Sequence, residues 1–110
     1  MKPFIAKRRL LYSLKSSNLR KEFVIGILTP QDLEEGDAPF QVGKDGCASC
    51  IITIEGMEGY DAFEEVVYGA DSLQAITLAT SGIEAILRRI QKKLEYDFFF
   101  LDDGSSYFES

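Results

Sequence analysis

The fold is decided by residues 71–94, which read DSLQAITLATSGIEAILRRIQKKL. Apolar residues recur there every three or four positions, the spacing that places side chains on one face of an α-helix. They are Leu73, Ile76, Ala79, Ile83, Ile86, Leu87, Ile90 and Leu94. Most of the positions between them are polar. The stretch therefore predicts one long amphipathic helix with a single apolar face.

Both the start and the interior of this helix carry informative residues. Asp71 precedes Gln74 by three positions, as in a capping box, in which the two side chains bond the first backbone amides. Glu84 and Arg88 are four residues apart and favour an ion pair on the helix surface. Gly82 costs roughly 1 kcal/mol against Ala in a helix interior. We expect the helix to approach the sheet closely at that glycine.

Shorter stretches on either side of the helix have the composition and alternation of strands. Strands are expected at residues 5–14, 22–29, 47–55 and 63–68 before the helix, and at 96–101 after it. Phe40 and Val42 resume strand character ahead of 47–55, and the acidic residues 31–39 are expected to form a loop. The predicted fold is α+β, with a mainly antiparallel sheet of about five strands, in the order β-β-β-β-α-β, packed on one long amphipathic helix.

The chain has 110 residues, the usual size of one domain. We expect a single domain over residues 1–110, in which residues 103–110 form a frayed tail or dock through Tyr107 and Phe108. The chain shows no secretory leader and no run of about 20 apolar residues, which predicts a soluble, cytoplasmic protein with no membrane partner. The net charge of −6 argues against a nucleic-acid partner, because phosphates attract positive charge.

Positive charge is concentrated near the N-terminus. Residues 1–21 hold seven of the twelve Lys and Arg residues and none of the eighteen acidic residues. One interpretation is a basic arm that binds RNA or lipid headgroups. The other is a first strand whose cations pair across the sheet with acidic neighbours. The second is favoured, because the cations are interleaved with core-type residues such as Leu10, Tyr12 and Leu14.

The last predicted strand is apolar on both faces. Phe98, Phe99, Phe100 and Leu101 follow one another without a polar position. Such a strand is usually central in its sheet, or has its second face covered by another chain. One helix covers only one face of a sheet, so either the sheet curls around itself or its second face is an interface. These four residues are therefore the candidate interface.

Residues suited to catalysis or metal binding are scarce. The chain has no His, which removes the commonest general base and metal ligand. Cys47 and Cys50 form a C-x-x-C pair, but a zinc site needs four N or S ligands. In a strand this odd separation sends the thiols to opposite faces, roughly 10 Å apart, which excludes a disulfide. We predict no catalytic residue, no metal and no cofactor, and an enzyme is not favoured.

The residues around the helix start resemble a bacterial pattern. Residues 68–79 read YGADSLQAITLA, and residues 50–56 ahead of them read CIITIEG. This is similar to a family of small bacterial proteins known only as a domain of unknown function, with Gly-x-Asp-Ser-Leu-Gln-Ala at the start of its helix. The resemblance implies a bacterial origin and an α+β fold, and it supplies no activity, substrate or catalytic residue. Gly69, Asp71 and Gln74 have a structural role in this motif.

Three functions remain open. The first, which we favour, is a non-catalytic protein-interaction module, as a homodimer or with another protein; small, acidic bacterial immunity proteins are one analogy. The second is a small-molecule-binding or enzymatic domain with its site between helix and sheet. That alternative predicts an aromatic-lined cavity and a buried acid, with Glu55 or Asp97 as candidates. The third is a thiol or metal function at Cys47 and Cys50.

Overall fold

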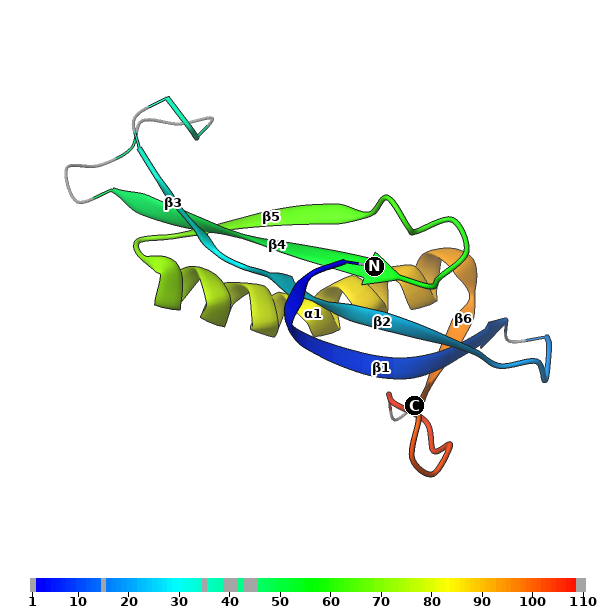
Figure 1. Cartoon of the computed structure of the whole chain (residues 1–110). Coiled ribbons are helices and arrows are strands. Elements are labelled where there is room, and N and C mark those ends of the chain that lie inside the picture. The colour runs from blue at the N-terminus through cyan, green and yellow to red at the C-terminus, as the bar shows by residue number, and fades with distance from the viewer. Residues whose placement is uncertain (1, 15, 35, 39–41, 43–45, 109–110) are drawn as a thin grey trace.

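The computed structural model describes residues 2–14, 16–34, 36–38, 42 and 46–108. Its elements follow one another as β1 (Phe4–Leu14), β2 (Lys21–Leu28), β3 (Gln31–Leu33), β4 (Cys47–Glu55), β5 (Glu64–Gly69), α1 (Ser72–Leu94) and β6 (Tyr96–Phe100) (Figure 1). The strands form one antiparallel sheet in the order β3-β4-β2-β1-β6, and β5 pairs with β4. The predicted α+β class, with an antiparallel sheet and one long helix, is confirmed.

The sheet has six strands, one more than predicted. The additional strand, β3, lies in the stretch expected to be a loop, and it pairs with the first three residues of β4. The side chains of Gln31 and Asp32 are exposed, so no apolar alternation marks this strand in the sequence. Of the two residues expected to resume strand character before β4, Phe40 lies outside the described residues. Val42 is buried but belongs to no strand.

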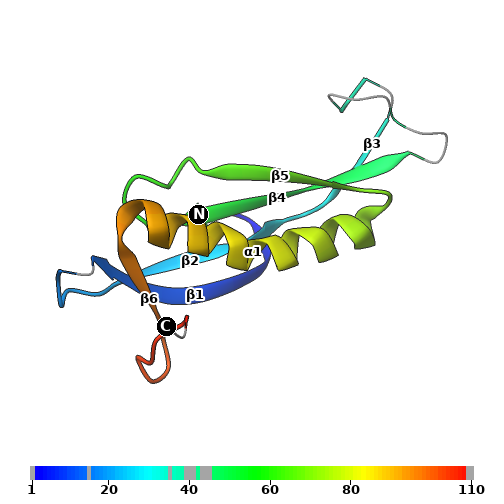
Figure 2. The ribbon, with the colours of Figure 1, turned by 180° about the vertical axis from the view of Figure 1, so that it is seen from behind.

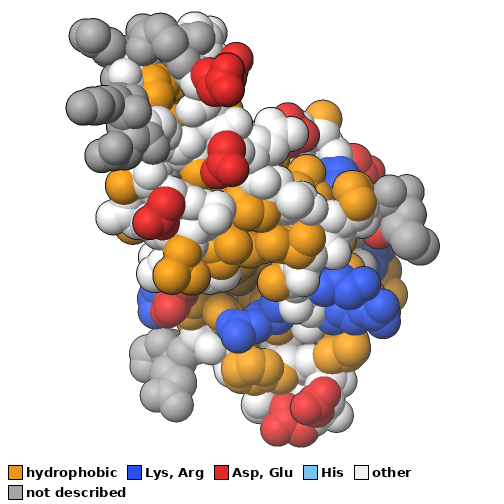
Figure 3. All heavy atoms as spheres, turned by 60° about the vertical axis from the view of Figure 1, so that its left-hand side comes forward, with side chains coloured by type: hydrophobic (Ala, Val, Ile, Leu, Met, Phe, Trp, Pro, Cys, Tyr) orange, Lys and Arg blue, Asp and Glu red, His pale blue; other side chains and the backbone are white. Residues whose placement is uncertain are grey.

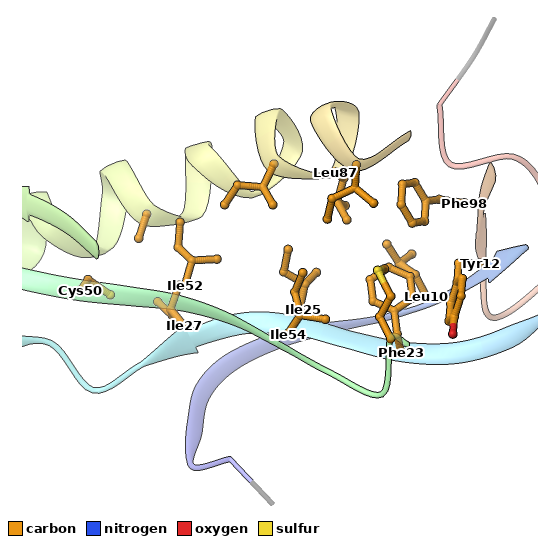
Figure 4. Packing of buried hydrophobic residues seen from close by; sticks show 14 of the residues in the cluster. Leu10, Tyr12, Phe23, Ile25, Ile27, Cys50, Ile52, Ile54, Leu87 and Phe98 are labelled. Carbon is orange, nitrogen blue, oxygen red and sulfur yellow. The ribbon is translucent and has the colours of Figure 1, made fainter. Parts of the chain in front are cut away.

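The helix lies along one face of the sheet, as Figures 1 and 2 show from opposite sides. It buries a narrow stripe made of Ala75, Ala79, Ile86, Leu87 and Ile90. The strands contribute the larger core side chains, most of which lie between the sheet and the helix (Figure 4): Leu10, Tyr12, Phe23, Ile25, Ile27, Cys50, Ile52, Ile54 and Phe98. Within the described residues, no helix is both long and apolar enough to cross a membrane.

Leu73 is not on the buried stripe of α1, contrary to prediction. Its side chain is 72% exposed. At 3.6 residues per turn, Leu73 points roughly a third of a turn away from the centre of the stripe. Leu73 and Ile76 are three residues apart, as on one face of a helix. Ile76, however, lies near the border of the buried face and is only partly buried, so Leu73 falls outside that face.

Three residues set the start of α1. Asp71 is the N-cap, and its Oδ1 accepts a hydrogen bond of 2.7 Å from the Gln74 backbone N–H. The Gln74 side chain accepts one of 2.5 Å from the Ala70 N–H, one residue before the amide that a capping box uses. A Cβ atom at Gly69 would lie 2.5 Å from the Ala75 nitrogen, so only glycine lets β5 end so close to α1.

The last strand, β6, is at the end of the sheet and is not central. One of its edges pairs with β1. The other carries the C-terminal residues, where Phe99 bridges to Ser106 and the Tyr107 N–H donates to the Phe98 carbonyl at 2.8 Å. Phe98 points into the core, whereas the Arg20 guanidinium carbon lies 3.6 Å from the centroid of the Phe99 ring. The chain itself therefore covers part of both apolar faces of β6.

The N-terminal residues cover part of the sheet face opposite α1. The Lys2 side chain donates to Thr53 Oγ1 at 2.7 Å, to the Asp61 carbonyl at 2.6 Å, and to the Ile54 carbonyl. The Lys2 backbone N–H donates to the Glu55 carboxylate at 2.8 Å. This segment is thereby tied to β4 and to the connection that follows it. The part of this sheet face around Thr53 and Glu55 is therefore not free.

Candidate functional site

Part of one edge of β1 has no neighbouring strand among the described residues. Along its first edge, β1 pairs with β2 from Phe4 to Tyr12. Along its second edge, β6 pairs only with Leu10–Leu14, because β6 ends at Phe100 opposite Leu10. The chain then turns back along the far side of β6. In the part of the chain that the structure describes, no strand follows the second edge of residues 5–9, and we call this segment the open edge.

A groove of about 370 Å³ lies between the open edge and α1. Ala6 and Arg8 share the core face of the sheet with their partners Ile27 and Ile25, yet both remain exposed because α1 does not cover them. Across the groove lie residues 80–84 of α1, among them Ile83. Figure 3 shows this side of the molecule, with hydrophobic side chains gathered at its centre and Lys and Arg side chains along their lower border.

Three consecutive cations border the open edge. Lys7, Arg8 and Arg9 are all exposed. One Arg8 nitrogen, Nη1, donates to the Tyr107 hydroxyl at 2.7 Å. The Arg9 guanidinium lies 4.0 Å from the Glu22 carboxylate, and a pair so exposed contributes at most about 1 kcal/mol. Lys7 has no hydrogen-bond or ion-pair partner among the described residues.

These contacts bear on the two interpretations of the basic N-terminus. Residues 4–14 form a strand with Leu10 and Tyr12 in the core, so the predicted first strand is confirmed. The expected pairing with acidic neighbours is found for Arg9 at the open edge and for Lys21, whose ammonium lies 3.9 Å from the Glu58 carboxylate. Of the three cations on this edge, Lys7 is therefore available to another molecule, whereas Arg8 and Arg9 are exposed but each has a partner within the chain.

The four predicted interface residues have different surroundings. Phe98 is 1% exposed and belongs to the core, and Phe99 lies under Arg20. Phe100 and Leu101 are each 41% exposed. The Phe100 ring lies 5.2 Å from the Tyr107 ring, centroid to centroid, and Tyr107 lines the groove. Phe100 is thus the one of the four that lies beside the groove.

The acids suggested for a site between helix and sheet lie elsewhere. Glu55 is opposite Val24, and Asp97 is opposite Ser13. Both registers place these carboxylates on the sheet face away from α1, and both side chains are half-buried. None of the Asp and Glu residues in the described ranges is buried. The structure therefore does not bring a buried acid to the helix–sheet groove.

The two cysteines lie in β4, as predicted, and neither forms a disulfide. Cys47 is opposite Leu33, and Cys50 is opposite Val67, so their odd separation places them on opposite faces of the sheet. Burial raises the pKa of the Cys50 thiol, which donates to the Leu28 carbonyl at 3.6 Å. The described residues contain no group of three His, Cys, Asp or Glu side chains that could hold a metal.

The open edge is the feature that sequence reasoning missed. Its only signal in the sequence is the run Lys7-Arg8-Arg9 inside an otherwise core-forming strand. Whether that run lies on a paired or an unpaired edge depends on where β6 stops relative to β1. That relation joins residues about ninety positions apart and has no local signature.

Comparison with known proteins adds no relative. No family model matches the chain, and no curated protein or solved structure is significantly similar to it. The resemblance of residues 68–79 to a bacterial family therefore stays a prediction. The open edge and the groove beside it are the features of the described residues that bear on function.

Proposed function

We propose that this protein is a non-catalytic protein-interaction module that binds an extended segment of a partner protein at the open edge. The observation that carries the proposal is the unpaired edge of residues 5–9 beside a groove. The edge of a sheet presents a row of free backbone N–H and C=O groups. An extended segment satisfies these groups by adding to the sheet as one more strand.

The groove supports this mode of binding because it supplies side-chain contacts. Successive side chains of a strand point to opposite faces of the sheet. Every second side chain of an added strand would therefore enter the space between β1 and α1, where Ile27 and Ile83 offer apolar contact. Backbone pairing then provides affinity, and the groove selects among segments.

A peptide-display selection with the intact protein as bait tests the proposal. The selected peptide is then added to isotope-labelled protein, and backbone amide shifts are mapped by NMR. Shifts are expected at residues 5–9 of β1 and at residues 80–84 of α1. The proposal is wrong if no peptide is enriched. It is equally wrong if the shifts cluster at the hollow lined by Tyr60, Phe63 and Ile90, on another part of α1.

Two threonines of α1 provide a matched pair of variants. Thr80 lines the groove, and Thr77 does not. Both are exposed, and each hydroxyl bonds to a carbonyl of the preceding turn, at 3.0 Å and 2.9 Å. Thr80→Arg is expected to weaken binding of the selected peptide at least about ten-fold by filling the groove. Thr77→Arg should leave binding within about two-fold, and equal losses in both variants would contradict the proposed location.

A further inference from the structure

We infer that the segment bound at the open edge is acidic and runs antiparallel to β1, as a continuation of β6. It carries acidic side chains opposite Lys7 and Arg9 and an apolar side chain opposite Ala6. This inference rests on the proposed function and specifies the chemistry of the partner. The partner is thus a protein with an exposed, extended stretch in which acidic residues alternate with neutral ones.

The register follows from the pairing already present. Phe99 lies opposite Leu11 and Phe100 opposite Leu10, so each step forward along β6 is a step backward along β1. A segment that continues this direction places its successive residues opposite Arg9, Arg8, Lys7 and Ala6. Antiparallel addition also matches every other strand pair of the sheet.

The two faces of the added strand meet different charges. Lys7 and Arg9 are opposite Gly26 and Val24, so their side chains leave β1 on the sheet face away from α1, although Lys7 is also among the residues that line the groove. Acidic side chains on that face pair with Lys7 and with Arg9, where they add to the Glu22 carboxylate that already lies 4.0 Å from the Arg9 guanidinium. On the groove face, Arg8 is already bonded to Tyr107, and Glu84, whose carboxylate lies 3.5 Å from the Arg88 guanidinium, lines the opposite wall. An acid there would face Glu84, whereas an apolar side chain opposite the small Ala6 fills the groove.

The same charges argue against a second copy of this chain as the occupant. Two open edges paired about a two-fold axis centred on Arg8 bring Lys7, Arg8 and Arg9 against the same three cations, and a register centred on Lys7 brings Lys7 against Lys7. Like charges directly opposite one another are destabilising in a sheet. The net charge of −6 does not prevent an acidic partner from binding, because charges more than about 8 Å away are largely screened at physiological salt.

Three synthetic peptides test the inference by fluorescence polarisation with the full chain. All share Ser-rich flanks, and their cores read Asp-Val-Glu-Leu, Asn-Val-Gln-Leu and Lys-Val-Lys-Leu. The acidic peptide is expected to bind at least about ten-fold more tightly than the neutral one, with an affinity that falls as salt rises. The basic peptide should not bind measurably.

Charge-reversed variants locate the effect. Lys7→Glu with Arg9→Glu should weaken the acidic peptide at least about ten-fold and improve the basic one. Lys92→Glu with Lys93→Glu, two exposed cations at the far end of α1, should change neither by more than about two-fold. Circular dichroism confirms that both double variants are folded, and Lys7→Gln with Arg9→Gln replaces the first if it is not.

The outcomes separate the two proposals. Equal binding of the acidic and neutral peptides, both lost in Thr80→Arg, overturns the acidic partner and keeps the edge-binding function. Failure of all three peptides overturns the inferred pattern, and the display selection then decides on the function independently. A single-stranded RNA oligonucleotide that displaces the acidic peptide and loses affinity in the Lys7 and Arg9 variant would also overturn an acidic protein as the partner.

Discussion

The Arg8 side chain donates a hydrogen bond of 2.7 Å to the hydroxyl of Tyr107, although the two residues are 99 positions apart. The bond ties the C-terminal segment to the first strand beside the end of β6. Tyr107 in turn packs edge-on against Phe108, whose side chain is buried. One residue of the open edge is therefore held by the docked C-terminus, while its neighbours Lys7 and Arg9 remain accessible.

Replacing Tyr107 by Phe removes this bond and leaves the ring in place. The bond is exposed, so we expect the free energy of unfolding to fall by no more than about 1 kcal/mol. The freed Arg8 should then tolerate an acid at the opposite peptide position, improving the affinity of a core that reads Asp-Asp-Glu-Leu. Urea unfolding and fluorescence polarisation measure the two effects. A loss of several kcal/mol would contradict the exposed, weak character of this bond.

Alanine substitutions at Gly82 and Gly69 should change the free energy of unfolding in opposite directions. A Cβ at Gly82 would lie 3.6 Å from Ile52 Cδ1, an ordinary contact, so the expected close approach leaves room for a methyl group. Gly82→Ala is expected to stabilise the protein by roughly 0.5–1 kcal/mol, through helix propensity. Gly69→Ala should destabilise it by roughly 1–3 kcal/mol, because its Cβ would collide with the Ala75 backbone. Equal effects in urea unfolding would contradict this packing at the helix start.

Thr53 is a fully buried polar residue that holds two segments to β4. Its Oγ1 accepts from the Lys2 ammonium and donates to the Phe63 carbonyl, each at 2.7 Å. Thr53→Val keeps the shape and removes both bonds, so we expect a loss of about 1–3 kcal/mol in the free energy of unfolding. Thr77→Val, on the exposed surface of α1, is the control and should cost much less. Comparable losses would show that the Thr53 bonds contribute little.

Cys47 and Cys50 should differ in reactivity. Burial raises the pKa of the Cys50 thiol, so at pH 8 a thiol reagent should label half-buried Cys47 much faster. The raised pKa also makes stability fall as the pH rises above about 8.5, the pKa of an unfolded thiol, because only the unfolded state then releases the proton. Urea unfolding at pH 7.5 and 9.5 should show a smaller fall in Cys50→Ala. Equal labelling rates would contradict the burial of Cys50.

The helix and five of the six strands were predictable because each carries its own pattern. Residues 71–94 combine a cap, an apolar period and a cationic end, and the structure starts and ends α1 within a residue of them. The strand predicted at 47–55 has the same bounds in the structure. These signals are local, since they depend on side chains that are near one another in the sequence.

The open edge was not predictable, because it depends on a relation between distant segments. The apolar run Phe98–Leu101 predicted either a central strand or a strand whose second face is covered by another chain, and β6 is at the end of the sheet and stops opposite Leu10. Its second face is covered by Arg20 and its far edge by residues 105–107. The alternation of side chains predicts that a strand exists, but it does not predict which edges are paired.

The most direct test of strand addition uses two N-methylated forms of the acidic peptide. Each form is methylated on one of the two sets of alternate backbone amides, so all side chains are kept. In an antiparallel strand pair only every second residue donates to the neighbouring strand. We expect one form to lose binding to the full chain and the other to bind as the parent peptide does. If both forms bind like the parent, the segment does not pair with the open edge, and the central claim is wrong.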